Sequence, residues 1–274
     1  MNPPTPPHAP EGPRGFVGCG RRAMMVGVQL PPSGPPREPD AGTDADTGPD
    51  AGAGAVAGAD VVRAAYAERA GEYAAVLGSM SAVHPDDIDL VTRWARGLDG
   101  PVLDLGCGPG HWTAYLAGHG LAQGGHAAPE HAGSGGLDVT GVDPVPAFVE
   151  HARRTHPGVR YEVGTAEHLS ADDGSVGGVL AWYSLIHHGP DAIEEPLREI
   201  TRVLRPGGRL LVGFFEAPTP EPFDHAVVTA WRWPVAELAA RLEAADLTVL
   251  ETTTRTDPGS RPHAAVVAER RPRD

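Results

Sequence analysis

Residues 101–112 read PVLDLGCGPGHW, an apolar stretch that runs directly into a turn with glycine at positions 106, 108 and 110. This pattern predicts a buried strand followed by a tight turn, because glycine tolerates backbone conformations that other residues avoid. A ligand can touch bare backbone at such a turn. In open α/β sheets ligands lie beyond the carboxyl ends of the strands, where this turn would be.

The remainder of the chain alternates between helical and strand patterns. Six helices are expected, with Asp60 capping the first, at 60–80, 86–98, 111–117, 146–155, 191–204 and 235–245. Seven strands are expected at 102–105, 139–142, 159–163, 176–182, 209–215, 247–252 and 264–268. Alternating strands and helices predict a largely parallel sheet. The last two strands, joined by TDPGSRP, predict an antiparallel hairpin at one edge.

Two segments are set apart by their composition. Residues 1–58 contain 12 prolines and 11 glycines, which predicts a disordered tail or a start codon assigned too early. Residues 122–137 have no periodic apolar face and predict a loop insertion. His126 and His131 in this loop lack supporting ligands at metal-site spacing, so no metal is expected. Residues 59–274 form the predicted domain.

Charge and residue types exclude several classes of protein. The net charge is −14, which disfavours a nucleic-acid partner. The chain has no lysine, which excludes a Walker-type phosphate loop and a pyridoxal Schiff base. No apolar run approaches membrane-spanning length, and the two cysteines give no disulfide framework. These features predict a cytoplasmic protein without a membrane partner.

Two carboxylates follow predicted strands and are candidate ligand contacts. Asp104 precedes the glycine turn, and Asp143 ends the next strand, where an acid can accept from both ribose hydroxyls of an adenosine. Removing residues 122–137 leaves a spacing of 23 positions from Asp104 to Asp143, close to the roughly 20-residue offset of nucleoside-binding βαβ units. A nicotinamide-binding turn needs a third glycine where this chain has His111.

Five stretches in this order resemble the successive motifs of class I S-adenosylmethionine-dependent methyltransferases: VLDLGCGPG, VTGVDP, VGTAEHL, GGVLAWYSLIHH and LREITRVLRPGGRLLVGFF. The resemblance covers about residues 59–270. It implies a Rossmann-like, seven-stranded, mostly parallel sheet with one antiparallel strand and helices on both faces. It implies S-adenosyl-L-methionine as the cofactor and a small-molecule acceptor.

The resemblance also implies roles for particular residues. The loop Gly106, Cys107, Gly108 and Gly110 would lie under the methionine part of the cofactor, with Cys107 as packing rather than a nucleophile. Asp104 would lie near the cofactor amino group. The other implied cofactor contacts are Asp143 and Pro144 at the ribose, Ala166 with Thr165 or Glu167 at the adenine, and Ala181 with Trp182 near the substrate entrance. LRPGG would be a structural turn.

Catalytic candidates are harder to define from the residues. His187 and His188 follow the fourth strand, and an imidazole that titrates near neutral pH suits a general base. One could instead cap a helix while the other packs; His84 and His225 are further candidates. Tyr66 and Tyr73 lie seven residues apart, and they either close over the cofactor or form a core stripe.

The acceptor and the class of activity stay open in part. Residues 213–234 concentrate five of the fifteen aromatic residues, which favours an apolar acceptor pocket. The first hypothesis is methyl transfer to a small molecule. The alternatives are a non-catalytic S-adenosylmethionine-binding protein and a nicotinamide-dependent reductase. The oligomeric state and the methylated atom are not indicated by the sequence.

Overall fold

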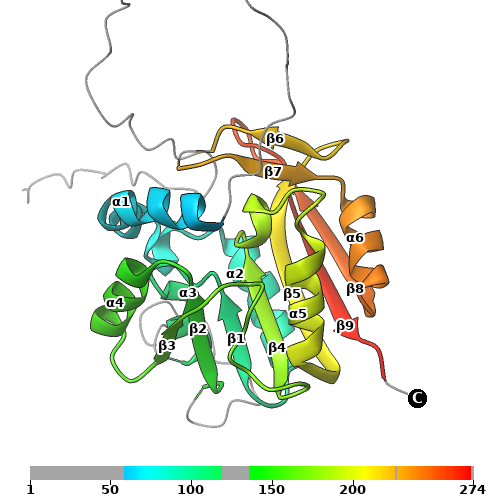
Figure 1. The fold of residues 1–274 in the computed structure, drawn as a ribbon, viewed down its shortest axis with the longest axis horizontal. Helices are drawn as coiled ribbons and strands as arrows, with labels where there is room; N and C mark the ends of the chain where they lie inside the picture. Colours follow the sequence, from blue (N-terminus) through cyan, green and yellow to red (C-terminus); the bar gives the residue numbers. More distant parts are fainter. Residues whose placement is uncertain (1–58, 119–135, 226, 273–274) are drawn as a thin grey trace, which may run out of the picture.

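The computed structural model describes residues 59–118, 136–225 and 227–272 (Figure 1). The predicted tail and all but the last two residues of the predicted insertion lie outside the described residues, so both stay predictions. The two described ends of the insertion meet, because Gly136 packs against the backbone of Ala117 and Gly118. The backbone N–H of Leu137 then donates to the carbonyl of Leu116 at 3.1 Å.

A parallel sheet is the centre of the molecule, and its order is β3-β2-β1-β4-β5. The strands are β1 (Val102–Leu105), β2 (Val139–Asp143), β3 (Arg160–Val163), β4 (Val176–Trp182) and β5 (Leu204–Glu216). All residues of β1 and β4 are buried. Central strands covered on both faces have nearly continuous apolar sequences, which is why these two were readable from the sequence.

The predicted hairpin closes the far edge of the sheet. It consists of β8 (Leu247–Arg255) and β9 (His263–Arg270), and β9 pairs antiparallel with both β5 and β8. The antiparallel strand is therefore second from the edge. The Rossmann-like, mostly parallel fold predicted from the sequence is confirmed.

The sheet has nine strands rather than the seven expected. The additional strands are β6 (Glu221–Phe223) and β7 (Ala230–Trp233), which form a small hairpin attached to the end of β5. They are three and four residues long, too short to produce a periodic pattern in the sequence. The aromatic segment is thus partly a strand pair, not only a loop.

In the described parts of the chain, six α-helices accompany the strands. They are α1 (Ala59–Leu77), α2 (Pro85–Arg96), α3 (His111–Leu116), α4 (Pro146–Thr155), α5 (Glu194–Val203) and α6 (Val235–Ala244). Helices α5 and α6 cover one face of the sheet, and α2 and α3 cover the other (Figure 1).

Both ends of the first expected helix differ in the structure. Asp60 lies inside the first turn of α1 and pairs with Arg63 instead of capping the helix. The helix ends at Leu77 rather than near Met80, and the backbone N–H of the next residue, Gly78, donates to the carbonyl of Ala74 at 3.0 Å. The backbone turns there, and a short 3-10 turn, Met80–Ala82, follows.

The predicted turn LRPGG belongs to β5, which begins at Leu204 instead of Arg209. Val176 pairs with Leu204, and Gly178 pairs with Arg209, so five steps along β5 oppose two along β4. The turn is a bulge in the strand, and its role is structural.

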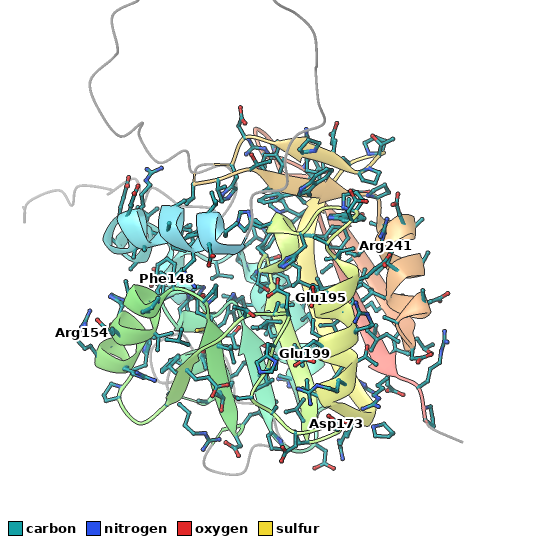
Figure 2. All side chains as sticks on the ribbon, in the orientation of Figure 1. Phe148, Arg154, Asp173, Glu195, Glu199 and Arg241 are labelled. Carbon is teal, nitrogen blue, oxygen red and sulfur yellow. The ribbon has the colours of Figure 1, made fainter. Side chains whose placement is uncertain are left out.

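Helix α1 and the β6–β7 hairpin lie at the same end of the sheet (Figure 1). Phe148 in α4 lies on the side facing α1, whereas Arg154 points away (Figure 2). Phe148 packs with Ala70, Tyr66 and Tyr73, so α1 is held over the start of α4. This end is the one at which β2 and β4 finish, and α1 therefore covers the carboxyl edge of the sheet.

Candidate functional site

A cavity lies between the glycine turn, the start of α4 and the underside of α1. It encloses about 530 Å³ of space, part of it open to solvent. Eight residues that the sequence analysis singled out line this cavity: Tyr66, Tyr73, Gly106, Gly108, Asp143, Pro144, Trp182 and His187. Its remaining lining residues are Val62, Val145, Phe148, Tyr183 and Ser184.

The glycine turn is held close to the end of β4. Gly106 has φ +69°, and a Cβ at this position would lie 2.2 Å from the Cβ of Ser184. The backbone N–H groups of Gly106 and Cys107 both donate to the carbonyl of Val142, at 2.7 and 3.1 Å. The turn is thereby fixed to β2, with its backbone along the cavity.

Asp143 connects the two loops that border the cavity. Its carboxylate accepts from the backbone N–H of Gly108 at 2.8 Å and of Val145 at 2.9 Å. Burial raises the pKa of Asp143 to about 6, although these two hydrogen bonds oppose the shift. Each carboxylate oxygen has a second lone pair, so Asp143 can still accept from ligand hydroxyls.

Asp104 and Cys107 lie beneath the turn and do not line the cavity. Asp104 accepts a hydrogen bond from the Thr113 hydroxyl at 2.6 Å, and burial raises its pKa to about 7. Cys107 packs among Val149, Ala152 and Tyr161. Burial raises the pKa of its thiol well above the usual value, so the group stays a thiol. The cysteine thus has the surroundings of a packing residue.

Gly110 also contributes to packing. A Cβ there would lie 2.7 Å from that of Ala152 and 2.8 Å from the hydroxyl of Tyr161. Beside it, both ring nitrogens of His111 are buried without a hydrogen-bond partner among the described residues, and burial lowers its pKa to about 4.

The residues predicted around an adenine do not line the cavity. Thr165 forms an isolated bridge with His168. Ala181, which was predicted near the substrate entrance, is fully buried in the core. Glu167 pairs with Nε2 of His188 at 2.7 Å. This hydrogen bond lowers the pKa of the Glu167 carboxyl to about 2. Glu167 is therefore an ionised partner of His188, while Ala166 packs against the core.

His187 is fixed in one tautomer by its surroundings. Its Nδ1 lies 2.9 Å from the carbonyl oxygen of Thr229, which can only accept, so Nδ1 carries the proton. Nε2 lies 3.0 Å from the Tyr66 hydroxyl and accepts its proton in a hydrogen bond. Burial lowers the pKa of His187 to about 4, so its ring is neutral near pH 7. Nothing in the sequence indicated Thr229 as its partner.

The other candidate histidines have different surroundings. His84 caps α2, with Nδ1 accepting from the backbone N–H of Asp86 at 3.2 Å. His225 lies against His187, with ring centroids 5.8 Å apart, and it also contacts Phe215 and Phe223. His84 thus has a structural role, and His225 belongs to the aromatic wall.

Tyr66 and Tyr73 pack in the core, which was one of the two alternatives; their closing over a cofactor stays a prediction. Their rings lie edge to face at 5.7 Å, and Tyr73 contacts Phe148 at 5.4 Å. They are therefore packing residues of α1, and both also line the cavity. Tyr183 and Ser184, which border it from β4, gave no recognisable signal in the sequence.

Replacing His225 with phenylalanine should reduce the dependence of stability on pH. Burial lowers the pKa of His225 to about 4, below its ordinary value of about 6.5. Its contribution to stability is present above pH 6.5 and is lost as pH falls toward 4. Urea unfolding at several pH values measures how the free energy of unfolding depends on pH. In the variant the slope of this free energy against pH should be shallower by up to about 1.4 kcal/mol per pH unit. Identical slopes would contradict the buried neutral state.

Two negative findings concern the described residues. None of the helices there is both long and apolar enough to cross a membrane. Within the same ranges, histidine, cysteine and acidic side chains form no group able to hold a metal ion.

The chain resembles known proteins in sequence. Residues 102–208 match a methyltransferase domain family. An uncharacterized methyltransferase of Mycobacterium tuberculosis is 37% identical over 115 residues, which are 40% of this chain and 37% of that protein. A demethylmenaquinone methyltransferase of Beutenbergia cavernae is 32% identical over 123 residues, 45% of this chain and 44% of that protein. The match therefore spans less than half of these relatives.

The fold is shared with solved structures. The Burkholderia thailandensis 1,6-didemethyltoxoflavin-N1-methyltransferase, bound to 1,6-didemethyltoxoflavin and S-adenosylhomocysteine, has a TM-score of 0.62 and 23% identity. The similarity covers 84% of this chain and 94% of that one. The [4+2]-cyclase SpnF has a TM-score of 0.51 and 18% identity over 67% of this chain and 78% of that one.

Proposed function

We propose that this chain is a class I S-adenosylmethionine-dependent methyltransferase that transfers a methyl group to a small-molecule acceptor; its match to a methyltransferase domain family over residues 102–208 and its fold support this proposal. The observation that carries the proposal is the cavity formed by Gly106, Gly108 and Asp143 beneath α1. It lies at the carboxyl edge of the sheet, beside the strand that precedes the glycine turn.

The residues around this cavity fit the cofactor. A Cβ on Gly108 would have only the Tyr73 ring near it, at 4.0 Å, so the absent side chain leaves space inside the cavity. The free lone pairs of Asp143 suit the two ribose hydroxyls, and Pro144 and Val145 offer an apolar border. S-adenosylmethionine supplies an electrophilic methyl group on a sulfonium, and its leaving group is neutral.

Alignment is the main contribution expected of the protein. Tyr66, Tyr73 and Phe148 pack together over one side of the cavity and would shield a bound cofactor there from water. Holding two reactants in line can supply roughly 7–11 kcal/mol of barrier reduction. A base is required only when the acceptor must lose a proton.

His187 is the base that the geometry favours. Its protonated Nδ1 is anchored on the Thr229 carbonyl, so Nε2 is aimed at the cavity as an acceptor. In the structure this nitrogen accepts a hydrogen bond from the Tyr66 hydroxyl. An acceptor hydroxyl or amine would take the place of Tyr66 and donate its proton to Nε2.

His188 has a different role in this proposal. It does not line the cavity, and its Nε2 is engaged by Glu167. We assign it to positioning, because its hydrogen bond with Glu167 ties the segment after β4 to the segment after β3. Thr165, Ala166 and Glu167 would then border the adenine through their backbone rather than their side chains.

The acceptor class rests on charge and on similar proteins. A net charge of −14 disfavours a nucleic acid. The B. cavernae relative is a demethylmenaquinone methyltransferase, and the B. thailandensis neighbour binds 1,6-didemethyltoxoflavin. Both names point to small organic acceptors.

A non-catalytic ligand-binding role is the second candidate. The SpnF neighbour is named a cyclase, which shows that the fold hosts reactions other than methyl transfer. Because Nε2 of His187 is already hydrogen-bonded to the Tyr66 hydroxyl, this contact also favours a binding role without catalysis. Release of S-adenosylhomocysteine with a panel of phenols, amines and carboxylates decides between binding and turnover.

Asp143→Ala should weaken binding of S-adenosylhomocysteine by about 1.5–3 kcal/mol, or roughly 10- to 150-fold. The alanine removes the carboxylate assigned to the ribose and also frees the N–H groups of Gly108 and Val145. Isothermal calorimetry measures the effect, with NAD as a ligand that should not bind.

Asp138→Ala is the matched control, because Asp138 is exposed and pairs only with Arg160 at the surface. It should bind as the parent does. Unchanged affinity in a folded Asp143→Ala protein would contradict the ribose assignment. Binding of NAD without S-adenosylhomocysteine would overturn the proposed function.

A further inference from the structure

Helix α1 forms one side of the proposed cofactor cavity through Val62, Tyr66 and Tyr73. It lies at the carboxyl edge of the sheet, outside the layers that pack on the two sheet faces (Figure 1). Among its described residues only Ala70 is buried, and the others are exposed or half-buried. A segment with so little buried apolar surface opens at a low free energy, so α1 has the packing of a movable cover.

The Tyr66 hydroxyl ties this cover to His187. It donates to Nε2 of His187 at 3.0 Å, although the two residues are 121 positions apart in the chain. Since Nδ1 of the same ring is held by the Thr229 carbonyl, Nε2 is the nitrogen left for a ligand. A single hydrogen bond between neutral groups contributes only modestly to stability, so another hydroxyl can take the place of this one.

The ring of Tyr66 lies in surroundings that suit an aromatic molecule. It meets the Tyr73 ring edge to face at 5.7 Å and the Phe148 ring at 6.1 Å. The His187 ring also meets it edge to face, at 5.5 Å. Aromatic rings attract one another in such arrangements at centroid distances of about 4.5–7 Å. The Tyr66 side chain therefore has both contacts that a free phenol needs, aromatic packing and an acceptor for its hydroxyl.

The charges of the cavity lining select a neutral molecule. Asp143 is the one acidic residue among the described lining residues, and these include no arginine. His187 is neutral near pH 7, because burial lowers its pKa to about 4. A carboxylate would enter this cavity without a cation to pair with and beside a group of its own charge, which is costly away from water.

The hydroxyl position of Tyr66 belongs to the same cavity as the proposed cofactor contacts. Gly106, Gly108 and Asp143 line this cavity together with Tyr66 and His187. A hydroxyl bonded to Nε2 would therefore share one space with the bound cofactor, as a methyl acceptor must. The cavity encloses about 530 Å³, and outward movement of the Tyr66 ring would enlarge it on the side of His187.

We propose that the methyl acceptor is a neutral phenol or hydroxylated heteroaromatic ring, and that Tyr66 occupies its position until α1 moves. The assignment rests on the proposed function. The acceptor hydroxyl takes over the hydrogen bond to Nε2 of His187, and the acceptor ring takes over the contacts with Tyr73 and Phe148. Tyr66 thus competes with the acceptor, and only a ring that carries a hydroxyl replaces everything that Tyr66 gives up.

Tyr66→Phe tests the competition. The variant keeps the ring but leaves Nε2 of His187 free, so an incoming phenol has one hydrogen bond fewer to break. We use p-cresol, which is the tyrosine side chain as a free molecule. It should bind to the variant about 2- to 12-fold more tightly than to the parent, as measured by saturation-transfer NMR with S-adenosylhomocysteine present. Unchanged or weaker binding of p-cresol would overturn the proposal.

Tyr115→Phe is the matched control. Tyr115 also has a hydroxyl that is hydrogen-bonded to a side chain, that of Thr92 at 2.7 Å, but it lies in α3 and does not line the cavity. The control should bind p-cresol as the parent does. If both variants gained equally, loosened packing would explain the effect, and Tyr66 would have no special place in it.

Two further probes of similar shape test the chemical class. Toluene lacks the hydroxyl of p-cresol, and 4-methylbenzoate has a carboxylate in its place. The Tyr66→Phe substitution should change toluene binding by less than twofold, and 4-methylbenzoate should bind at least tenfold more weakly than p-cresol. A gain for toluene as large as that for p-cresol would contradict the hydrogen bond. Equal binding of 4-methylbenzoate and p-cresol would contradict the neutral class.

Nitrogen NMR on protein with isotope-labelled histidine locates the phenol. An unprotonated ring nitrogen changes its resonance when it accepts a hydrogen bond, and His187→Gln identifies the signal by removing it. Tyr66→Phe should move the Nε2 resonance of His187, p-cresol should move it back, and toluene should not. A resonance that stays in place at saturating p-cresol would put the phenol elsewhere and sink the assignment.

Calorimetry with S-adenosylhomocysteine keeps the two proposals apart. Failure of the parent to bind this nucleoside would refute the proposed function. Binding of the nucleoside by the parent, without a gain in p-cresol binding by Tyr66→Phe, would refute the acceptor assignment alone. Tyr66→Leu also removes the hydroxyl and should show the same gain, so the test does not depend on the folding of one variant.

Discussion

His187→Gln is expected to lower turnover by about 10²–10⁴-fold on an acceptor that must lose a proton, the usual effect of removing a general base. Glutamine can replace the hydrogen bond to Tyr66 but cannot take up the proton. Binding of S-adenosylhomocysteine should stay within a few-fold of the parent. Single-turnover release of S-adenosylhomocysteine, normalised to folded protein, measures the loss.

The pH profile is an independent readout for the same residue. The sequence alone predicted an ionisation near neutral pH, but burial lowers the pKa of His187 to about 4. A protonated imidazole cannot accept, so activity should be lost as pH falls through about 4 and should be flat above it. His151→Gln, in α4 and outside the cavity, is the matched control. If the His187→Gln variant turned over as fast as the parent, the general base would have to be a residue other than His187.

Gly106→Ala is expected to cost roughly 2–5 kcal/mol of stability and to abolish cofactor binding. The new Cβ would lie 2.2 Å from that of Ser184, and φ +69° is strained for alanine. The glycine turn would have to move from the end of β4. Thermal melts and calorimetry with S-adenosylhomocysteine measure both effects.

Gly207→Ala separates the steric contact from the backbone strain. Gly207 has a similar φ of +75°, yet a Cβ there would meet nothing within 4 Å. Its cost should be limited to about 1–2 kcal/mol, with binding unchanged. Equal losses in the two variants would show that conformation, not the contact with Ser184, makes glycine necessary at position 106.

The sequence predicted best those helices and strands whose own residues show a clear apolar pattern. Strands β1 and β4 and helix α4 have the bounds expected for them, because their apolar residues follow one period and punctuating residues flank them. The hairpin of β8 and β9 was readable from a short proline- and glycine-containing link. Strands β6 and β7 were not, since three or four residues cannot show a period.

The candidate site was only partly readable. The motifs led to Gly106, Gly108, Asp143 and His187, all of which line the cavity. The motifs also led to Asp104 and Glu167, whose side chains are hydrogen-bonded to Thr113 and His188, respectively. A motif gives the place of a residue on a strand end, but the direction of its side chain depends on neighbours from other elements.

The sequence by itself determined the fold class, the strand that feeds the glycine turn and the acid that follows the next strand, because these depend on local residue order. Only the tertiary structure decided which histidine reaches the cavity, in which tautomer, and with what pKa. The Thr229 carbonyl that holds Nδ1 is 42 residues away from His187, and the Tyr66 hydroxyl on Nε2 is 121 residues away. Hydrogen bonds and burial of this kind arise from chain segments that meet only in the folded state, so no local pattern can encode them.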